Sequence, residues 1–420
     1  MSALLTYALT AFGVLLAVTS LVSARSRLIL FYILMFMTMG GLQIELPLLG
    51  SGMRSALALL LLAVSWRTVA TTIAWLRTTR ILTPMIALAA YLLVSNLVIS
   101  TNPSLKTSFE NAGNFIFFLI CVAFLMSGTD RQVKWLLIVT ALGLLSNILA
   151  YTPRWIPFMS DTTVFGPVPH YQEPASSGLM ILPILLMFLH SEPKIRGRVI
   201  SLAGIVFVTV ATFITGARTP SAAYIVVLAL YRRKIWWALS LLALGALVFT
   251  MLPENEQTDR MVDRIQQLSV AARTGTLHEN PDAGMRLENV RIALTGFMEK
   301  PVFGWGIGSW HSYRQESTGR LGYILSAHSG WALLLFETGV VGAILYLLFL
   351  IRCLKGLKLS FTGDLAGDVG YIAFLGVTAL MLVSLGGDTL LKRGIFTYFS
   401  FGAYARCAAI RKMTWERAGS

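Results

Sequence analysis

The chain has 420 residues, of which 56% are hydrophobic and only 13% are charged, and its mean hydropathy is +0.71. Soluble domains usually carry about 25% charged residues, and apolar runs of about 20 residues recur along this chain. These values exclude an ordinary soluble fold and predict a polytopic membrane protein. The net charge of +14 is compatible with a nucleic-acid partner, but the apolar runs favour a bilayer, so we expect membrane lipids and no nucleic acid.

Apolar segments follow one another along almost the whole sequence. Each must be helical, because unpaired backbone amides are not tolerated in hydrocarbon. No basic region precedes the first segment, so we expect no cleavable signal peptide. The segments lie at about 3–22, 28–46, 54–75, 81–99, 108–126, 132–151, 175–190, 199–216, 219–231, 235–252, 328–351, 366–386 and 394–410.

The connections between these segments alternate between basic and basic-poor. The positive-inside rule makes the basic connections and the basic C-terminal tail cytoplasmic. Thirteen crossings would then leave the N-terminus outside. We expect that the region 54–75, interrupted by Arg67, or the short run 219–231 is not a full crossing. The prediction is an all-α protein with about twelve transmembrane helices and both ends inside.

The chain divides into three parts: transmembrane helices over 1–252, a large external loop over 253–327, and C-terminal transmembrane helices with a cytoplasmic tail over 328–420. The loop holds nine of the 20 acidic residues and eight basic residues, although external loops are usually poor in arginine. Long structured loops are usually functional. Helical spacing predicts amphipathic helices over 256–272 and 281–298.

The second loop helix carries the first candidate site residue. It begins at Asn280-Pro281, has an apolar side made by Met285, Val290, Leu294 and Phe297, and ends before Lys300-Pro301. Arg286 lies in its first turn, where free N–H groups and the helix dipole favour an anion. A structural alternative is a pair with Glu288, Asp282 or a lipid headgroup. Arg291 is about 140° further round the helix and is only a possible supporting residue.

A second arginine, Arg218, lies between two spans at the external face, in Thr215-Gly216-Ala217-Arg218-Thr219-Pro220. A charge so close to hydrocarbon is costly unless it faces a polar cavity or partner, so it is a candidate functional residue. The alternative is that Thr219-Pro220 merely begins a helix and Arg218 extends to the headgroups.

His328 opens the next span, and an imidazole with a reference pKa near 6.5 can act as a general base there. An interfacial histidine that only caps the helix is an equally good interpretation. His311 is a weaker candidate without a helical anchor. The three alternating glycines in Phe303-Gly304-Trp305-Gly306-Ile307-Gly308 predict a tight structural turn, because neither a Rossmann nor a P-loop context surrounds them.

No metal-binding motif is present in the sequence, so we expect no metal and no other cofactor. If the protein handles phosphates, arginine must supply the charge that a metal would otherwise give. Arginine suits that role, because its charge is fixed and its donors are bidentate.

An ordered set of short motifs resembles one family of bacterial membrane proteins. The motifs are Thr215-Gly216-Ala217-Arg218-Thr219, Gly284-Met285-Arg286, Lys300-Pro301-Val302-Phe303-Gly304-Trp305-Gly306, Ala327-His328-Ser329 and Glu337-Thr338-Gly339. They are similar to the shared region of O-antigen ligases, O-antigen polymerases and protein O-oligosaccharyltransferases, over about residues 200–350. The resemblance implies a GT-C type fold with a large periplasmic loop, in the bacterial inner membrane.

The resemblance also implies roles for three residues. His328 would be the catalytic base, and Arg218 and Arg286 would bind the diphosphate of an undecaprenyl-diphosphate-linked donor. The chain departs from the family pattern at Ser329, where asparagine is common, and at Ala217, where serine is common. An amide or hydroxyl role at those two positions is therefore not expected.

Within the family, a ligase that transfers O-antigen to lipid A–core is favoured. One dominant loop near the C-terminus resembles ligases more than polymerases, and the chain ends just after its last span, whereas protein-glycosylating relatives often carry a soluble C-terminal domain. The reaction is expected to be metal-independent and inverting. The alternatives are the polymerase, the oligosaccharyltransferase, and a non-catalytic polysaccharide or lipid transporter, which a dozen helices would also suit.

Overall fold

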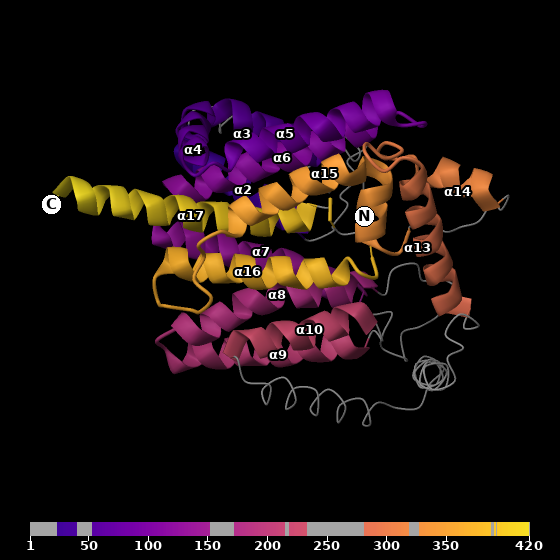
Figure 1. The fold of residues 1–420 in the computed structure, drawn as a ribbon. Coiled ribbons are helices and arrows are strands. Elements are labelled where there is room, and N and C mark those ends of the chain that lie inside the picture. Colours follow the sequence, from indigo (N-terminus) through magenta and orange to yellow (C-terminus); the bar gives the residue numbers. More distant parts are fainter. Residues whose placement is uncertain are drawn as a thin grey trace, which may run out of the picture.

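The computed structural model describes residues 23–39, 53–151, 172–214, 218–232, 281–318, 327–387, 390–391 and 393–419. Within these ranges every regular element is a helix (Figure 1). The helices are α2 (Ala24–Met39), α3 (Met53–Val64), α4 (Trp66–Thr78), α5 (Leu82–Val94) with a π-helical turn (Ser95–Ile99), α6 (Leu105–Ser127), α7 (Asp130–Tyr151), α8 (Gln172–Ser191), α9 (Ile195–Ile214), α10 (Arg218–Arg232), α13 (Pro281–Glu299), α14 (Trp310–Thr318), α15 (Gly330–Leu354), α16 (Leu365–Val383) and α17 (Arg393–Gly419).

Six helices of the described residues are long and apolar enough to cross a membrane, which confirms an all-helical polytopic membrane protein. They are Leu82–Ile99, Leu105–Ser127, Asp130–Leu149, Ile195–Thr212, Gly330–Leu354 and Leu365–Val383. The two segments for which we expected an incomplete crossing both differ from these six helices. The first is a pair of helices bent by 87° between Val64 and Trp66, and the second is a short apolar helix, Thr219–Tyr231.

The total of about twelve crossings stays a prediction. The apolar segments 3–22 and 235–252 and the expected loop helix 256–272 lie outside the described residues.

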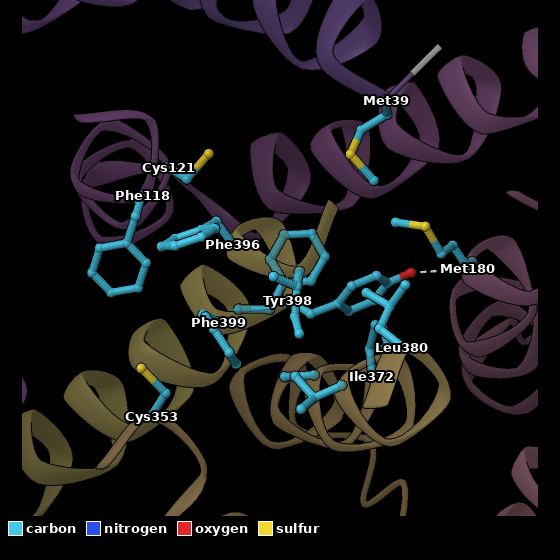
Figure 2. Packing of buried hydrophobic residues seen from close by; sticks show 14 of the residues in the cluster. Met39, Phe118, Cys121, Met180, Cys353, Ile372, Leu380, Phe396, Tyr398 and Phe399 are labelled. Atoms are coloured by element: carbon cyan, nitrogen blue, oxygen red, sulfur yellow. Dashed lines mark hydrogen bonds between the residues drawn. The ribbon is translucent and has the colours of Figure 1, made fainter. Parts of the chain in front are cut away.

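Aromatic side chains of α17 fill the centre of the bundle. Phe396 and Phe399 pack against Phe349 of α15, and Phe118 of α6 lies edge-on to the same ring. Figure 2 shows Phe118, Phe396 and Phe399 in this core. The hydroxyl of Tyr398 donates to the carbonyl of Met180 in α8 (Figure 2). Cys121, Cys353 and Cys407 are buried in this core and form no disulfide. The core therefore joins α6, α8, α15 and α17. The helices α13 and α14 pack in a separate, smaller cluster with the first segment of α15.

The helix α15 is broken at Gly339, whose φ of 61° is outside the helical region. We expected a continuous span over 328–351. Instead, Gly330–Thr338 forms a first segment and a second segment runs to Leu354 (Figure 1). Glycine allows the break because it lacks the Cβ that makes this conformation costly for other residues.

The loop helix expected over 281–298 is confirmed as α13 and ends at Glu299, as predicted. It lies beside α14 across one end of the bundle and packs on α15 (Figure 1). Its expected apolar side was partly wrong, because Leu294 is 43% exposed. The side that packs inward is made by Asn289, Ala293 and Gly296 instead. Small side chains let the helices approach closely, so side-chain size decided the packed face here.

Candidate functional site

The segment at His328 has an uncommon backbone. Its φ is +54°, in the left-handed region that few residues other than glycine adopt, although histidine is enriched there. Ser329 then caps α15, since its hydroxyl accepts from the amide of Ala332 at 3.4 Å. The preceding Ala327 is fully buried, and His328 is half-buried. The fold therefore fixes the main chain on both sides of the candidate base.

The connection between α16 and α17 holds this segment in place. The amide of Gly330 donates to the carbonyl of Ser384 at 2.8 Å and to that of Gly387 at 3.0 Å. A Cβ on Gly330 would lie 3.0 Å from the Gly387 oxygen, so glycine makes this close approach easier. We call residues 384–387 the α16–α17 turn.

The start of α10 packs on the same turn. Thr219 lies so near Gly386 that a Cβ on that glycine would be 2.5 Å from the Thr219 Oγ1. Arg218 is the first residue of α10, and its side chain lies outside the described residues. The α16–α17 turn thus brings the backbone that follows Arg218 and the backbone that follows His328 to one place, although 110 residues separate these two in the sequence.

Arg286 is on α13 and is half-buried. It lies one helical turn before Asn289 and two turns before Ala293, so it shares the inward-packing face of the helix. That face packs on the first segment of α15 through Gly296, where a Cβ would be 2.6 Å from the Phe336 ring. Arg286 therefore projects from the side of α13 that faces the segment beginning at Gly330.

The two supporting candidates are both exposed. Arg291 lies on the outer side of α13, and His311 is the second residue of α14. Neither belongs to the packed faces that surround the α16–α17 turn. Their support for the site stays a prediction without a structural observation in its favour.

The glycine-rich turn after α13 docks on the break in α15, which agrees with its predicted structural role. The amides of Trp305 and Gly306 donate to the carbonyls of Phe336 and Glu337, each at 2.9 Å. In the other direction, the amides of Val340 and Val341 donate to the carbonyls of Pro301 and Val302, at 2.9 and 3.1 Å. The turn supplies hydrogen-bond partners for backbone groups that the break in α15 leaves free.

All three alternating glycines of this turn have positive φ. The φ angles of Gly304, Gly306 and Gly308 are 70°, 89° and 86°. The hydroxyl of Tyr91 in α5 donates to the carbonyl of Thr338 at 2.6 Å and to that of Phe303 at 3.0 Å. Two motifs of the sequence resemblance, 300–306 and 337–339, therefore form one structural unit.

Among the buried charged residues, one on α14 and one on α15 had no role in the sequence analysis. Glu337 is 8% exposed, and its Oε1 accepts from the amide of Gly308 at 2.9 Å. Arg314 of α14 is also 8% exposed, and its Nε donates to the Oδ1 of Asn289 at 2.9 Å. The available signal for Arg314 was its position four residues after Trp310, which places both on one helix face.

Metal-binding side chains do not gather in the part of the chain that the structure describes, where no three of His, Cys, Asp and Glu form a cluster. Metal independence stays a prediction for the whole protein.

An apolar groove of about 710 Å³ lies between α7, α8 and α9. It extends from Leu149, two residues before the end of α7, to Gly197, near the start of α9. Since α7 and α9 are candidate spans, the groove runs along much of the membrane-spanning part of the bundle. Its walls include Leu145, Leu185 and Phe207.

Comparison with known proteins identifies one family. Residues 200–347 match the family model described as O-antigen ligase. No curated protein matches the chain. The matched range contains α10, α13, α14 and the first segment of α15, and therefore Arg218, Arg286 and His328.

Proposed function

We propose that this chain, whose residues 200–347 form a domain of the O-antigen ligase family, transfers O-antigen from undecaprenyl diphosphate to lipid A–core at the periplasmic face of the bacterial inner membrane. Ligase-type glycosyl transfer is the activity implied by the family match. The donor, the acceptor, the membrane and the face are our inference.

One structural observation carries the proposal. The start of α10 and the segment at His328 meet on the α16–α17 turn, and the inward face of α13 packs on the helix that follows His328. This arrangement supports a single site to which Arg218, Arg286 and His328 all contribute.

The two arginines act on the leaving group. As the bond between the anomeric carbon and the diphosphate oxygen breaks, its electron pair passes to the diphosphate, which gains negative charge. Arg218 and Arg286 stabilise that charge with fixed positive charges and directed donors. Donors of this kind lower a barrier by about 3–4 kcal/mol each in other enzymes.

His328 acts on the acceptor. Its imidazole takes the proton of an acceptor sugar hydroxyl while the hydroxyl oxygen attacks the anomeric carbon in line with the leaving diphosphate. A single in-line displacement inverts the configuration at that carbon. The constrained backbone at His328 supports this role, because a fixed main chain keeps the base in one orientation.

The apolar groove between α7, α8 and α9 holds the polyprenyl tail. Its walls are mostly hydrocarbon side chains, with Glu192 and Ser201 also among the lining residues, and it runs from near the outer end of α7 toward the other end of the spans. Van der Waals packing of the isoprenoid chain against these side chains would hold the tail beside the spans, with the diphosphate near the external end of the bundle.

The proposal is tested with purified protein, one lipid-linked donor, and lipid A–core, donor repeat unit or acceptor peptide offered separately. Transfer to lipid A–core with release of undecaprenyl diphosphate is the expected result. Preferred transfer to the repeat unit or the peptide would replace the ligase assignment by the polymerase or the oligosaccharyltransferase. Absence of any donor cleavage would favour a transporter.

A further inference from the structure

A buried arginine joins the two helices α13 and α14. The guanidinium of Arg314 is permanently charged, and burying a charge is unfavourable unless it is paired or hydrogen-bonded. Its Nε donates to the Oδ1 of Asn289, whose side chain is fully buried on α13. An apolar pair could fill the same space without that desolvation cost, so the polar contact indicates a geometric requirement.

The contact involves only one side of the Asn289 amide. Its Oδ1 accepts from Arg314, while its Nδ2 is buried and has no hydrogen-bond partner among the described residues. The amide therefore contributes as an acceptor. A carboxylate of the same shape would accept equally well, and a leucine of similar size would not.

This contact lies one turn from Arg286 on the same face of α13. A second link between the two helices is the hydrogen bond from the Tyr313 hydroxyl to the Glu299 Oε1, at 2.9 Å. Gly296 lies between these links and packs closely on Phe336. Together the contacts at Asn289, Gly296 and Glu299 fix the rotation of α13 about its own axis, and that rotation sets the direction in which Arg286 projects.

We propose that Arg314 is a positioning residue, which holds α13 through Asn289 and thereby keeps Arg286 directed at the diphosphate. This inference rests on the proposed function, because it takes the diphosphate as the ligand of Arg286. Arg314 acts through Arg286 and does not touch the substrate.

The test measures the Kd of undecaprenyl diphosphate, which requires no transfer reaction, with the full chain in detergent. Arg286→Ala should raise the Kd by about 10–100-fold, the loss expected for one charge-assisted hydrogen bond. Arg314→Met should raise it by about tenfold in the unmodified protein and by less than about twofold in Arg286→Ala, because it acts only through Arg286. Gln315→Met, an exposed neighbour on α14, is the matched control and should leave the Kd unchanged.

Variants of Asn289 separate positioning from stability. Asn289→Asp keeps the acceptor and should retain the Kd within about threefold, whereas Asn289→Leu should raise it by about tenfold. The apolar pair Arg314→Met with Asn289→Leu should recover the melting temperature lost in the single variants without recovering the Kd.

Three results would overturn the inference. An equal effect of Arg314→Met with and without Arg286 would make Arg314 an independent ligand. An unchanged Kd in folded Arg314→Met would remove any role in binding. Recovery of the Kd together with the melting temperature in the apolar pair would leave Arg314 a purely structural role. Two other results would contradict the proposed function itself and the inference with it. One is an unmodified protein that does not bind undecaprenyl diphosphate, and the other is a Kd that Arg286→Ala leaves unchanged.

Discussion

The amide of Gly330 donates a hydrogen bond to the carbonyl of Gly387 at 3.0 Å, and this contact joins the segment after His328 to the α16–α17 turn. One residue earlier in that turn, Gly386 packs against Thr219 at the start of α10. The α16–α17 turn therefore contacts two segments of the matched region, although the turn itself lies outside residues 200–347.

The packing at Gly386 predicts a suppressor pair. Gly386→Ala would place its Cβ 2.5 Å from the Thr219 Oγ1, so α10 or the turn must shift. Small displacements of catalytic groups can cost about 100-fold in rate, so we expect a fall in kcat of about 10–100-fold in a folded protein. Adding Thr219→Ala removes the obstructing hydroxyl and should restore most of the rate.

The control for this prediction is Leu385→Ala, which changes an exposed neighbour in the same turn and should leave turnover intact. Normal turnover in Gly386→Ala, or failure of Thr219→Ala to improve it, would show that the contact does not set the site geometry.

The break in α15 predicts a large loss of stability in Gly339→Ala. The φ of Gly339 is 61°, and a Cβ there would lie 2.6 Å from the amide nitrogen of Gly304. Gly356→Ala is the matched control, since its φ is 79° but no atom lies within 4 Å of its Cβ. We expect Gly356→Ala to cost about 1 kcal/mol and Gly339→Ala several times as much, seen as a lower melting temperature in detergent. Equal melting temperatures in the two variants would mean that docking of the glycine-rich turn after α13 does not stabilise the break in α15.

Glu337 predicts a difference between its amide and hydrocarbon replacements. Glu337→Gln keeps an oxygen that accepts from the Gly308 amide, and we expect it to retain the melting temperature of the unmodified protein. Glu337→Leu leaves that amide without its acceptor and should cost about 1–3 kcal/mol. A loss of turnover in a stable Glu337→Gln would instead assign the carboxylate charge a role in the reaction.

Metal independence can be tested by chelation. Guanidinium groups are proposed to stabilise the leaving diphosphate, so treatment with EDTA should leave the rate of donor cleavage unchanged. A rate that falls on chelation and returns with a divalent cation would refute the assignment of that charge stabilisation to Arg218 and Arg286.

The sequence was sufficient to predict the helical membrane class, because the length of the apolar segments is a local signal. It also predicted the limits of α13, because Pro281 and Lys300-Pro301 mark its two ends locally. The incomplete crossing expected at 54–75 or 219–231 stays a prediction, although 54–75 contains the bent helix pair. The packed face of α13 was not predictable, because it depends on a partner far away in the sequence. Gly296 and Ala293 lie on that face because the ring of Phe336 packs against it and leaves no room for larger side chains.

The partners of Arg314 and Glu337 could not be predicted either. An arginine in a loop of mixed charge gives no local sign that its partner is Asn289, 25 residues away. The break at Gly339 depends on hydrogen bonds to the backbone at 301–306. A hydropathy profile contains no information on those partners, so it predicts one continuous span across the break.

The most direct test of the account measures donor binding and turnover in the same preparation of His328→Ala. A general base contributes about 10²–10⁴-fold to a rate, so turnover should fall by that factor. The Kd of the undecaprenyl-diphosphate-linked donor should stay within about twofold, because the arginines and the groove remain. Normal turnover in His328→Ala would contradict the account, and loss of donor binding would make His328 a binding residue rather than the base.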